Sequence, residues 1–104
     1  MPFPKNTCVI RLKERRLINI KGGVKFYLLS PDLNRRLEFM YDVLEPSACT
    51  PLYTHEGEEC GLVLKGKIEV TIGDKKYILE EGDSISFSSS TSHRLRNIGK
   101  KKRY

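Results

Sequence analysis

The strongest constraint on this chain is a period-two alternation of apolar and polar side chains, broken every six to ten residues by turn-forming residues. In the run KIEVTI, Ile68, Val70 and Ile72 share one parity, and in SISFS Ile85 and Phe87 do the same. Successive side chains of a strand point to opposite faces, so this pattern predicts strands with one buried face. No segment of twelve or more residues has the apolar spacing and capping signals of a helix.

Further short apolar runs are expected to form strands. They are CVIRL (8–12), LINI (17–20), KFYLLS (25–30), an alternating run over 37–43, CGLVL (60–64) and YILE (77–80). Turn chemistry separates several of them, and Gly73-Asp74 suits a tight hairpin. Eight or nine short strands with frequent turns predict an all-β sandwich or barrel.

Length, charge and cysteine content place the chain in a broad class. A chain of 104 residues forms one domain with a single core. No apolar run is long enough to cross a membrane, and the first residues lack the pattern of a secretory signal, so we expect a cytoplasmic protein. Three widely spaced cysteines indicate reduced thiols. The net charge of +6 is partly concentrated in the KKKR run at 100–103, which indicates a solvated basic tail rather than a nucleic-acid-binding face.

Two segments hold most of the polar chemistry. The first is THEGEECGLVLKG, residues 54–66, and the second is GDSISFSSSTSHRLRN, residues 82–97. They contain the only two histidines of the chain, His55 and His93, and Glu59 follows His55 by four residues.

The first segment resembles a signature of the cupin superfamily. That signature has a His, a second His two residues on, a Glu shortly after, and a Gly seven positions beyond the Glu. His55, Glu59 and Gly66 match it, whereas Gly57 stands at the position that we assign to the second His.

The second segment resembles the other cupin signature, which contains a Gly, a Pro, a Gly, a His and an Asn. Gly82, His93 and Asn97 match it, and Ser88 and Ser90 stand where Pro and Gly are usual. The resemblance implies a small double-stranded β-helix, the jelly-roll barrel of cupins.

From about Val9 to about Gly99 the chain resembles the ligand-sensing cupin domain of bacterial transcriptional regulators. In those proteins the cupin domain follows a helix-turn-helix domain of the xenobiotic-response-element type, and nothing in this chain offers two capped helices joined by a turn. The expectation is one cupin domain over 1–104, with a lead-in at 1–8. Residues 99–104 would form a basic tail that begins a truncated final strand.

The resemblance also raises the question of whether the site binds a metal ion. Cupin sites typically use three His and one Glu, a donor set that suits Fe, Mn, Ni or Zn. With Gly57 lacking a side chain, His55, Glu59 and His93 remain as a two-His-one-carboxylate face. The alternative is a metal-free pocket in which these three groups hydrogen-bond one another and an organic ligand. We favour the metal-free interpretation because one ligand is missing, and we expect any metal to be held weakly.

Period-two reasoning nominates the walls of the pocket. If His93 points inward, Leu95 and Asn97 do too, and Tyr53 shares the parity of His55. Aromatic side chains are normal in small-molecule sites, although core packing is the alternative for each of them. The predicted pocket residues are Tyr53, His55, Glu59, His93, Asn97, Phe87, Phe39 and Tyr41.

Two classes of function fit these residues. One is a binding module that senses a small metabolite and alters DNA binding by a separate helix-turn-helix domain, with no catalytic residue. The other is a metal-dependent cupin enzyme of dioxygenase, isomerase or decarboxylase type, in which Glu58 or Tyr53 assists proton transfer. Small cupins resemble one another in forming homodimers, and the predicted strand over 7–12 has an edge that a partner would cover. We therefore expect a homodimer.

Overall fold

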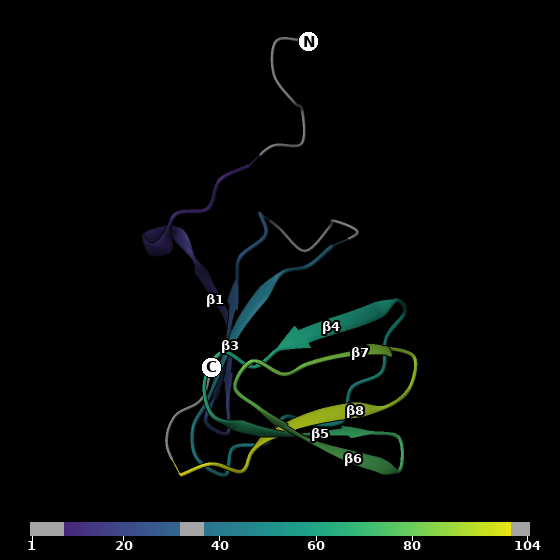
Figure 1. The fold of residues 1–104 in the computed structure, drawn as a ribbon. Coiled ribbons are helices and arrows are strands. Elements are labelled where there is room, and N and C mark those ends of the chain that lie inside the picture. The colour runs from purple at the N-terminus through teal and green to yellow at the C-terminus, as the bar shows by residue number, and fades with distance from the viewer. Residues whose placement is uncertain (1–7, 32–36, 101–104) are drawn as a thin grey trace.

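The computed structural model describes residues 8–31 and 37–100, which form eight strands and one short 3-10 helix (Figure 1). The elements are η1 (Leu12–Glu14), β1 (Arg16–Lys21), β2 (Val24–Leu28), β3 (Met40–Leu44), β4 (Glu58–Leu62), β5 (Lys67–Ile72), β6 (Lys75–Glu80), β7 (Ser84–Ser88) and β8 (His93–Asn97). The described residues contain no α-helix, and the all-β prediction is confirmed.

The strands form three antiparallel sheets with the orders β1-β2-β3, β4-β7 and β6-β5-β8. In Figure 1 the β4-β7 pair lies over the β6-β5-β8 sheet, while β1 and β3 extend away from one end of these two layers. The segment before β4 runs beside β8 through two bridges, Cys49 with Arg96 and Tyr53 with His93. The β4-β7 and β5-β8 pairs and these two bridges thus join segments that are distant in sequence, as a jelly roll requires.

Two hairpins depend on glycine. Gly22 and Gly23 connect β1 to β2 with φ of 58° and 82°, the two positive values that a type I′ turn requires. Gly73 is the first residue of the two-residue turn between β5 and β6 and has φ of 60°. The predicted Gly73-Asp74 hairpin is therefore confirmed.

The core consists of two small apolar clusters joined by one residue. Val24, Leu44 and Ala48 form the first, and Val63, Ile68 and Val70 form the second. Leu95 of β8 packs against both clusters, so β8 links the β1-β2-β3 sheet to the rest of the domain. The predicted inward face of β5 is confirmed, because Ile68 and Val70 are both buried.

The predicted strand over 7–12 is wrong within the described residues. Residues 8–11 belong to no strand, and Leu12 begins η1 with 73% of its surface exposed. The local backbone bonds to itself: Glu14 N–H donates to Arg11 O at 2.8 Å, and Arg11 N–H donates to the Glu14 side chain at 2.8 Å. An apolar run without a neighbouring strand has no ladder to join, so local turn bonds prevail.

Three other strands are shifted from their predicted bounds. The run over 60–64 forms β4 two residues earlier, at Glu58–Leu62, and the run over 37–43 forms β3 only from Met40. β2 ends at Leu28, two residues before the predicted end. Residues 101–104, which include most of the basic tail and its predicted truncated strand, lie outside the described residues.

The core predicts a sharp contrast between two aliphatic residues of the β5-β6 hairpin. Val70 is 1% exposed and Ile78 is 51% exposed. Val70→Ala should lower the free energy of unfolding by roughly 2 kcal/mol through lost burial and a residual cavity. Ile78→Ala should change it by less than about 0.5 kcal/mol. Urea unfolding monitored by circular dichroism measures both, and equal losses would contradict this description of the core.

Candidate ligand and metal site

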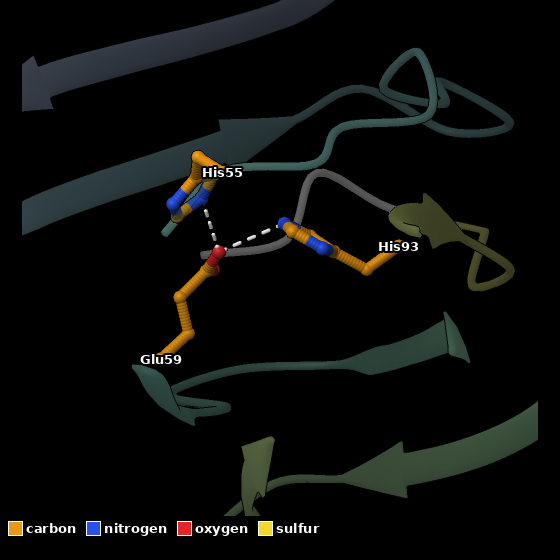
Figure 2. Close-up of side chains that lie close together, drawn as sticks. All are labelled: His55, Glu59 and His93. Atoms are coloured by element: carbon orange, nitrogen blue, oxygen red, sulfur yellow. Dashed lines mark hydrogen bonds and ion pairs between the residues drawn. The ribbon is translucent and has the colours of Figure 1, made fainter. Parts of the chain in front are cut away.

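The structure brings His55, Glu59 and His93 together in one cluster (Figure 2). His55 lies in the loop before β4, Glu59 lies in β4 and His93 begins β8. The Oε2 atom of Glu59 is 2.8 Å from Nε2 of His55 and 2.8 Å from Nε2 of His93. One carboxylate oxygen therefore stands between two imidazole nitrogens.

Backbone pairing fixes the geometry of this cluster. Tyr53 and His93 exchange two backbone hydrogen bonds, of 2.8 and 3.0 Å, which hold the loop before β4 against β8. Glu59 pairs with Phe87 across the β4-β7 ladder. Because paired residues project to the same face of a sheet, Glu59 shares its face with Phe87. The Phe87 ring lies 4.9 Å from the His93 ring.

Ser89 organises the site, although no pattern in the SFSSSTS run (86–92) distinguishes it from its neighbours. Its side chain is fully buried and its Oγ donates to Glu59 Oε2 at 3.2 Å. Its backbone N–H donates to Gly57 O at 2.9 Å, and its carbonyl accepts from His55 N–H at 2.9 Å. One residue thus positions both the carboxylate and the loop that carries His55.

The two histidines are held in the same tautomer. Nδ1 of His55 is 3.1 Å from the carbonyl oxygen of Glu56, and Nδ1 of His93 is 2.8 Å from the carbonyl oxygen of Thr91. A carbonyl oxygen can only accept a hydrogen bond, so each Nδ1 must carry a proton. Each Nε2 is left to face Glu59 either as a bare lone pair or with a second proton.

This arrangement satisfies the chemical requirements of a metal site. With Nδ1 already carrying a proton in each ring, two hydrogen bonds from the Nε2 atoms to Glu59 Oε2 require one further proton on each Nε2 atom. A divalent cation bound to the same atoms supplies the same charge as those two protons. The three ligand atoms lie within 4.8 Å of one another, and backbone carbonyls fix the tautomer as they do behind metal-bound imidazoles. His55, Glu59 and His93 therefore fit a divalent metal.

Tyr53 also lies beside this cluster, and Gly57 contributes no side chain to it. A Cβ at Gly57 would meet no heavy atom within 4 Å, and the φ of 106° there disfavours any L side chain. Tyr53 is paired directly with His93, and the two rings lie 6.3 Å apart. The predicted shared face of Tyr53 and His55 agrees with this placement.

A mostly apolar cavity adjoins the cluster. Its volume is about 300 Å³, and it lies along β5, β6 and β7. The lining residues are Ile72, Tyr77, Leu79, Ser84, Ile85, Ser86 and Phe87. Phe87 borders both the cavity and His93, and Ile72 pairs with His93 across the β5-β8 ladder. An apolar compartment and a polar cluster thus share a boundary.

Three predicted pocket residues lie away from the cluster. Asn97 is 1% exposed and its amide supports the backbone, with Nδ2 donating to Leu44 O at 2.9 Å and Oδ1 accepting from Gly99 N–H at 2.8 Å. Phe39 precedes β3 and is 62% exposed. The Tyr41 ring packs against Tyr27 at 6.3 Å. The structure does not bring these three side chains to His55 and His93.

Asp42 is a candidate site residue that the sequence analysis missed. It alternates with Tyr41 along β3 and therefore lies on the opposite face, the face of buried Leu44. Its Oδ1 atom is buried and has no hydrogen-bond partner among the described residues. Burial, and secondarily the charge of Glu59, raises the pKa of Asp42 to about 7.

The raised pKa predicts a pH-dependent stability. Folded Asp42 keeps its proton to about pH 7, whereas the unfolded chain loses it near pH 3.8. The free energy of unfolding should therefore fall as pH rises between these values, and Asp42→Asn should remove this contribution. Thermal melts at pH 4.5 and pH 8 should show Asp42→Asn gaining roughly 5 °C relative to the wild type at the higher pH. Parallel pH profiles of the two proteins would contradict the burial of this carboxyl.

Comparison with known proteins identifies the family. The chain matches the family model described as "Cupin domain" over residues 40–103, and it belongs to the cupin family. The predicted cupin fold is confirmed, and structural relatives share it over most of their length. Among the described residues, no helix has the length and apolar character that a membrane span requires.

Relatives include both regulators and an enzyme-like protein. The chain is 34% identical over 65 residues to the HTH-type transcriptional regulator PuuR of Escherichia coli, covering 62% of this chain and 35% of PuuR. It thus spans about a third of the length of that relative. The cupin domain of an XRE family transcriptional regulator from Enterobacter cloacae superposes with a TM-score of 0.71 at 21% identity, covering 78% of this chain and 88% of that domain. A predicted oxalate decarboxylase from Thermotoga maritima gives 0.71 at 25% identity, with 92% of each chain covered.

Proposed function

We propose that this chain is the small-molecule-sensing cupin domain of a cytoplasmic transcriptional regulator. The observation that carries the proposal is the continuous boundary between the apolar cavity and the His55–Glu59–His93 cluster at Phe87. The likeness to PuuR and to the cupin domain of an XRE family regulator supports the regulatory role. In this proposal residues 1–104 form one sensor domain, and DNA is bound by a helix-turn-helix domain elsewhere in the regulator.

The site separates two kinds of ligand contact. Ile72, Ile85 and Phe87 would exclude water from the body of a ligand, while the polar cluster would fix its head group. Sites of this kind gain most of their binding energy from apolar burial and most of their selectivity from a few polar groups. Sensing further requires that the ligand prefer one of two states of the whole regulator.

A ligand screen by thermal shift tests the proposal. A metabolite at one hundred times its Kd should raise the free energy of unfolding by about 2.7 kcal/mol. His55→Ala should weaken that stabilisation at the same ligand concentration, because His55 belongs to the cluster and its side chain is 52% exposed, so its removal costs little stability. Glu58→Ala is the matched control, since Glu58 is exposed and lies on the other face of β4 from Glu59. Stabilisation that is equal in all three proteins would place the ligand elsewhere.

A second candidate function is a metal-dependent cupin enzyme, and the shared tautomer of the two histidines favours it. A bound divalent metal would act as a Lewis acid toward substrate oxygen. His55, Glu59 and His93 would hold it, and Ser89 would keep Glu59 oriented. Tyr53, beside His93, would be the residue best placed to exchange a proton with a ligand.

The amount of bound metal distinguishes the sensor function from the enzyme function. It also tests whether Tyr53 or Gly57 stands where a fourth metal ligand could bind. Protein prepared without an affinity tag should take up Zn²⁺ or Fe²⁺ more tightly after Tyr53→His, because a third imidazole would then stand beside His93. Gly57→His should give no gain, since its backbone has φ of 106° and its side chain would begin in open space. Elemental analysis after dialysis measures the bound metal. A stoichiometric metal in the wild type that is lost in His55→Ala would favour the enzyme.

We also propose that the domain pairs as a homodimer. Val9, Leu12 and Phe39 are each at least 60% exposed in a single chain, which leaves apolar surface for a partner to cover. Light scattering should then report twice the 12.0 kDa mass of one chain.

A further inference from the structure

The inner face of the β6-β5-β8 sheet carries a lysine at the end of the sheet where His93 lies. Ile72 of β5 pairs with Lys75 on β6 and with His93 on β8, so these three residues form one row across the sheet. Paired residues project to the same face, and residues two apart along a strand do so too. The row therefore shares the face of Val70, which is buried in the core.

Lys75 borders the apolar cavity. Its cross-strand partner Ile72 lines that cavity, and so does Tyr77, which follows two residues later on the same face of β6. Directly opposed residues have Cβ atoms about 5 Å apart, so the four-carbon side chain of Lys75 can reach a group bound over Ile72. Lys75 is exposed, and no carboxylate among the described residues forms an ion pair with it. Its charge is therefore available to a ligand.

The other end of the cavity is acidic. Leu79 and Ser84 line that end, on either side of the turn that connects β6 to β7. Glu80, Glu81 and Asp83 lie in or beside this turn, and all three are exposed. The cavity thus has a basic end at Lys75 and an acidic end at the turn, so its electrostatics favour an anionic group at the first end alone.

Glu59 is directed at the two histidines and not at the cavity. Its Oε2 atom lies 2.8 Å from an imidazole nitrogen of each histidine and accepts from the Ser89 hydroxyl at 3.2 Å. Glu59 does not line the cavity, whereas its ladder partner Phe87 does. A group bound over Ile72 therefore lies between Lys75 on one side and His93 on the other, with Phe87 as a further neighbour.

The cavity itself suits an apolar body. Ile72, Leu79, Ile85 and Phe87 give it mainly aliphatic and aromatic walls, and its volume is about 300 Å³. Burial against such walls supplies binding energy to hydrocarbon and penalises a charge that has no partner. A ligand that fits both the walls and the basic end has an apolar body and one terminal anion.

We propose that the cavity binds a small carboxylate whose apolar body lies against Ile85 and Leu79 and whose carboxylate accepts a hydrogen bond from the Lys75 ammonium. This inference rests on the proposed function, in which the barrel binds a small molecule. It adds to that site a ligand class and a residue that selects for it.

Four probes test the ligand class on the full chain. They are hexanoate, n-hexanol, n-hexylamine and butyrate, titrated by heteronuclear NMR at low ionic strength after a chelator has removed metal ions, so that no carboxylate binds through a metal. Hexanoate should bind about threefold more tightly than n-hexanol, the gain typical of an exposed ion pair. It should also bind more tightly than n-hexylamine. Butyrate should bind on the order of tenfold more weakly than hexanoate, because two fewer methylene groups are buried.

Lys75→Glu tests the residue. It should lower the affinity for hexanoate about tenfold, raise the affinity for n-hexylamine and leave that for n-hexanol unchanged. Lys76→Glu is the matched control, because it makes the same charge change one residue further along β6, on the opposite face. It should change each affinity by less than about twofold. Both lysines are exposed, so both variants should fold, and circular dichroism checks this.

The outcomes separate this inference from the function on which it rests. Equal affinity for hexanoate and n-hexanol, tighter binding of n-hexylamine, or equal effects of the two substitutions would overturn the carboxylate assignment while leaving a ligand-binding barrel. Failure of all four probes to bind would also overturn it. In that case, stabilisation by another metabolite in the thermal screen would preserve the sensor function, and its absence would remove both.

Discussion

A single carboxylate oxygen, Oε2 of Glu59, defines the polar end of this barrel. It lies 2.8 Å from Nε2 of both His55 and His93 and also accepts the hydroxyl proton of Ser89. These partners come from the loop before β4, from β8 and from the turn that precedes β8. The cluster exists only because the jelly-roll topology places those segments side by side, so the fold is a precondition of the chemistry.

The same oxygen explains why the site suits a cation. Backbone carbonyls fix the proton of each imidazole on Nδ1, so both Nε2 atoms are directed at Glu59. A divalent metal ion bound to these three atoms would place positive charge beside the Glu59 carboxylate. On β3, the Oδ1 atom of Asp42 is also buried and has no hydrogen-bond partner among the described residues.

Much of this arrangement could be predicted from the sequence. Alternation along β5 predicted its buried face, and Gly73-Asp74 predicted the β5-β6 hairpin. The cupin spacing nominated His55, Glu59 and His93, which the structure brings together. These features are local or depend on a family pattern. The strand predicted over 8–12 failed because an apolar run cannot form a ladder unless a neighbouring strand is available, and availability is a tertiary property.

Asp42 and Ser89 could not be selected from the sequence, for physical reasons. In the alternating run over 37–43, Phe39 and Tyr41 are aromatic, so hydrophobicity favoured their face as the inner one. The inner face of β3 instead carries Asp42, which pairs with Phe26 and has a buried Oδ1 atom. Ser89 lay in a serine-rich run that resembles a loop, and only its burial and its bond to Glu59 distinguish it from its neighbours.

Nitrogen-15 NMR of the two imidazole rings tests the central claim most directly. Long-range correlations between ring protons and ring nitrogens report which nitrogen of each histidine is protonated. The account predicts a protonated Nδ1 in both His55 and His93, because each faces a backbone carbonyl. A neutral ring with its proton on Nε2 and a bare Nδ1, in either histidine, would contradict it.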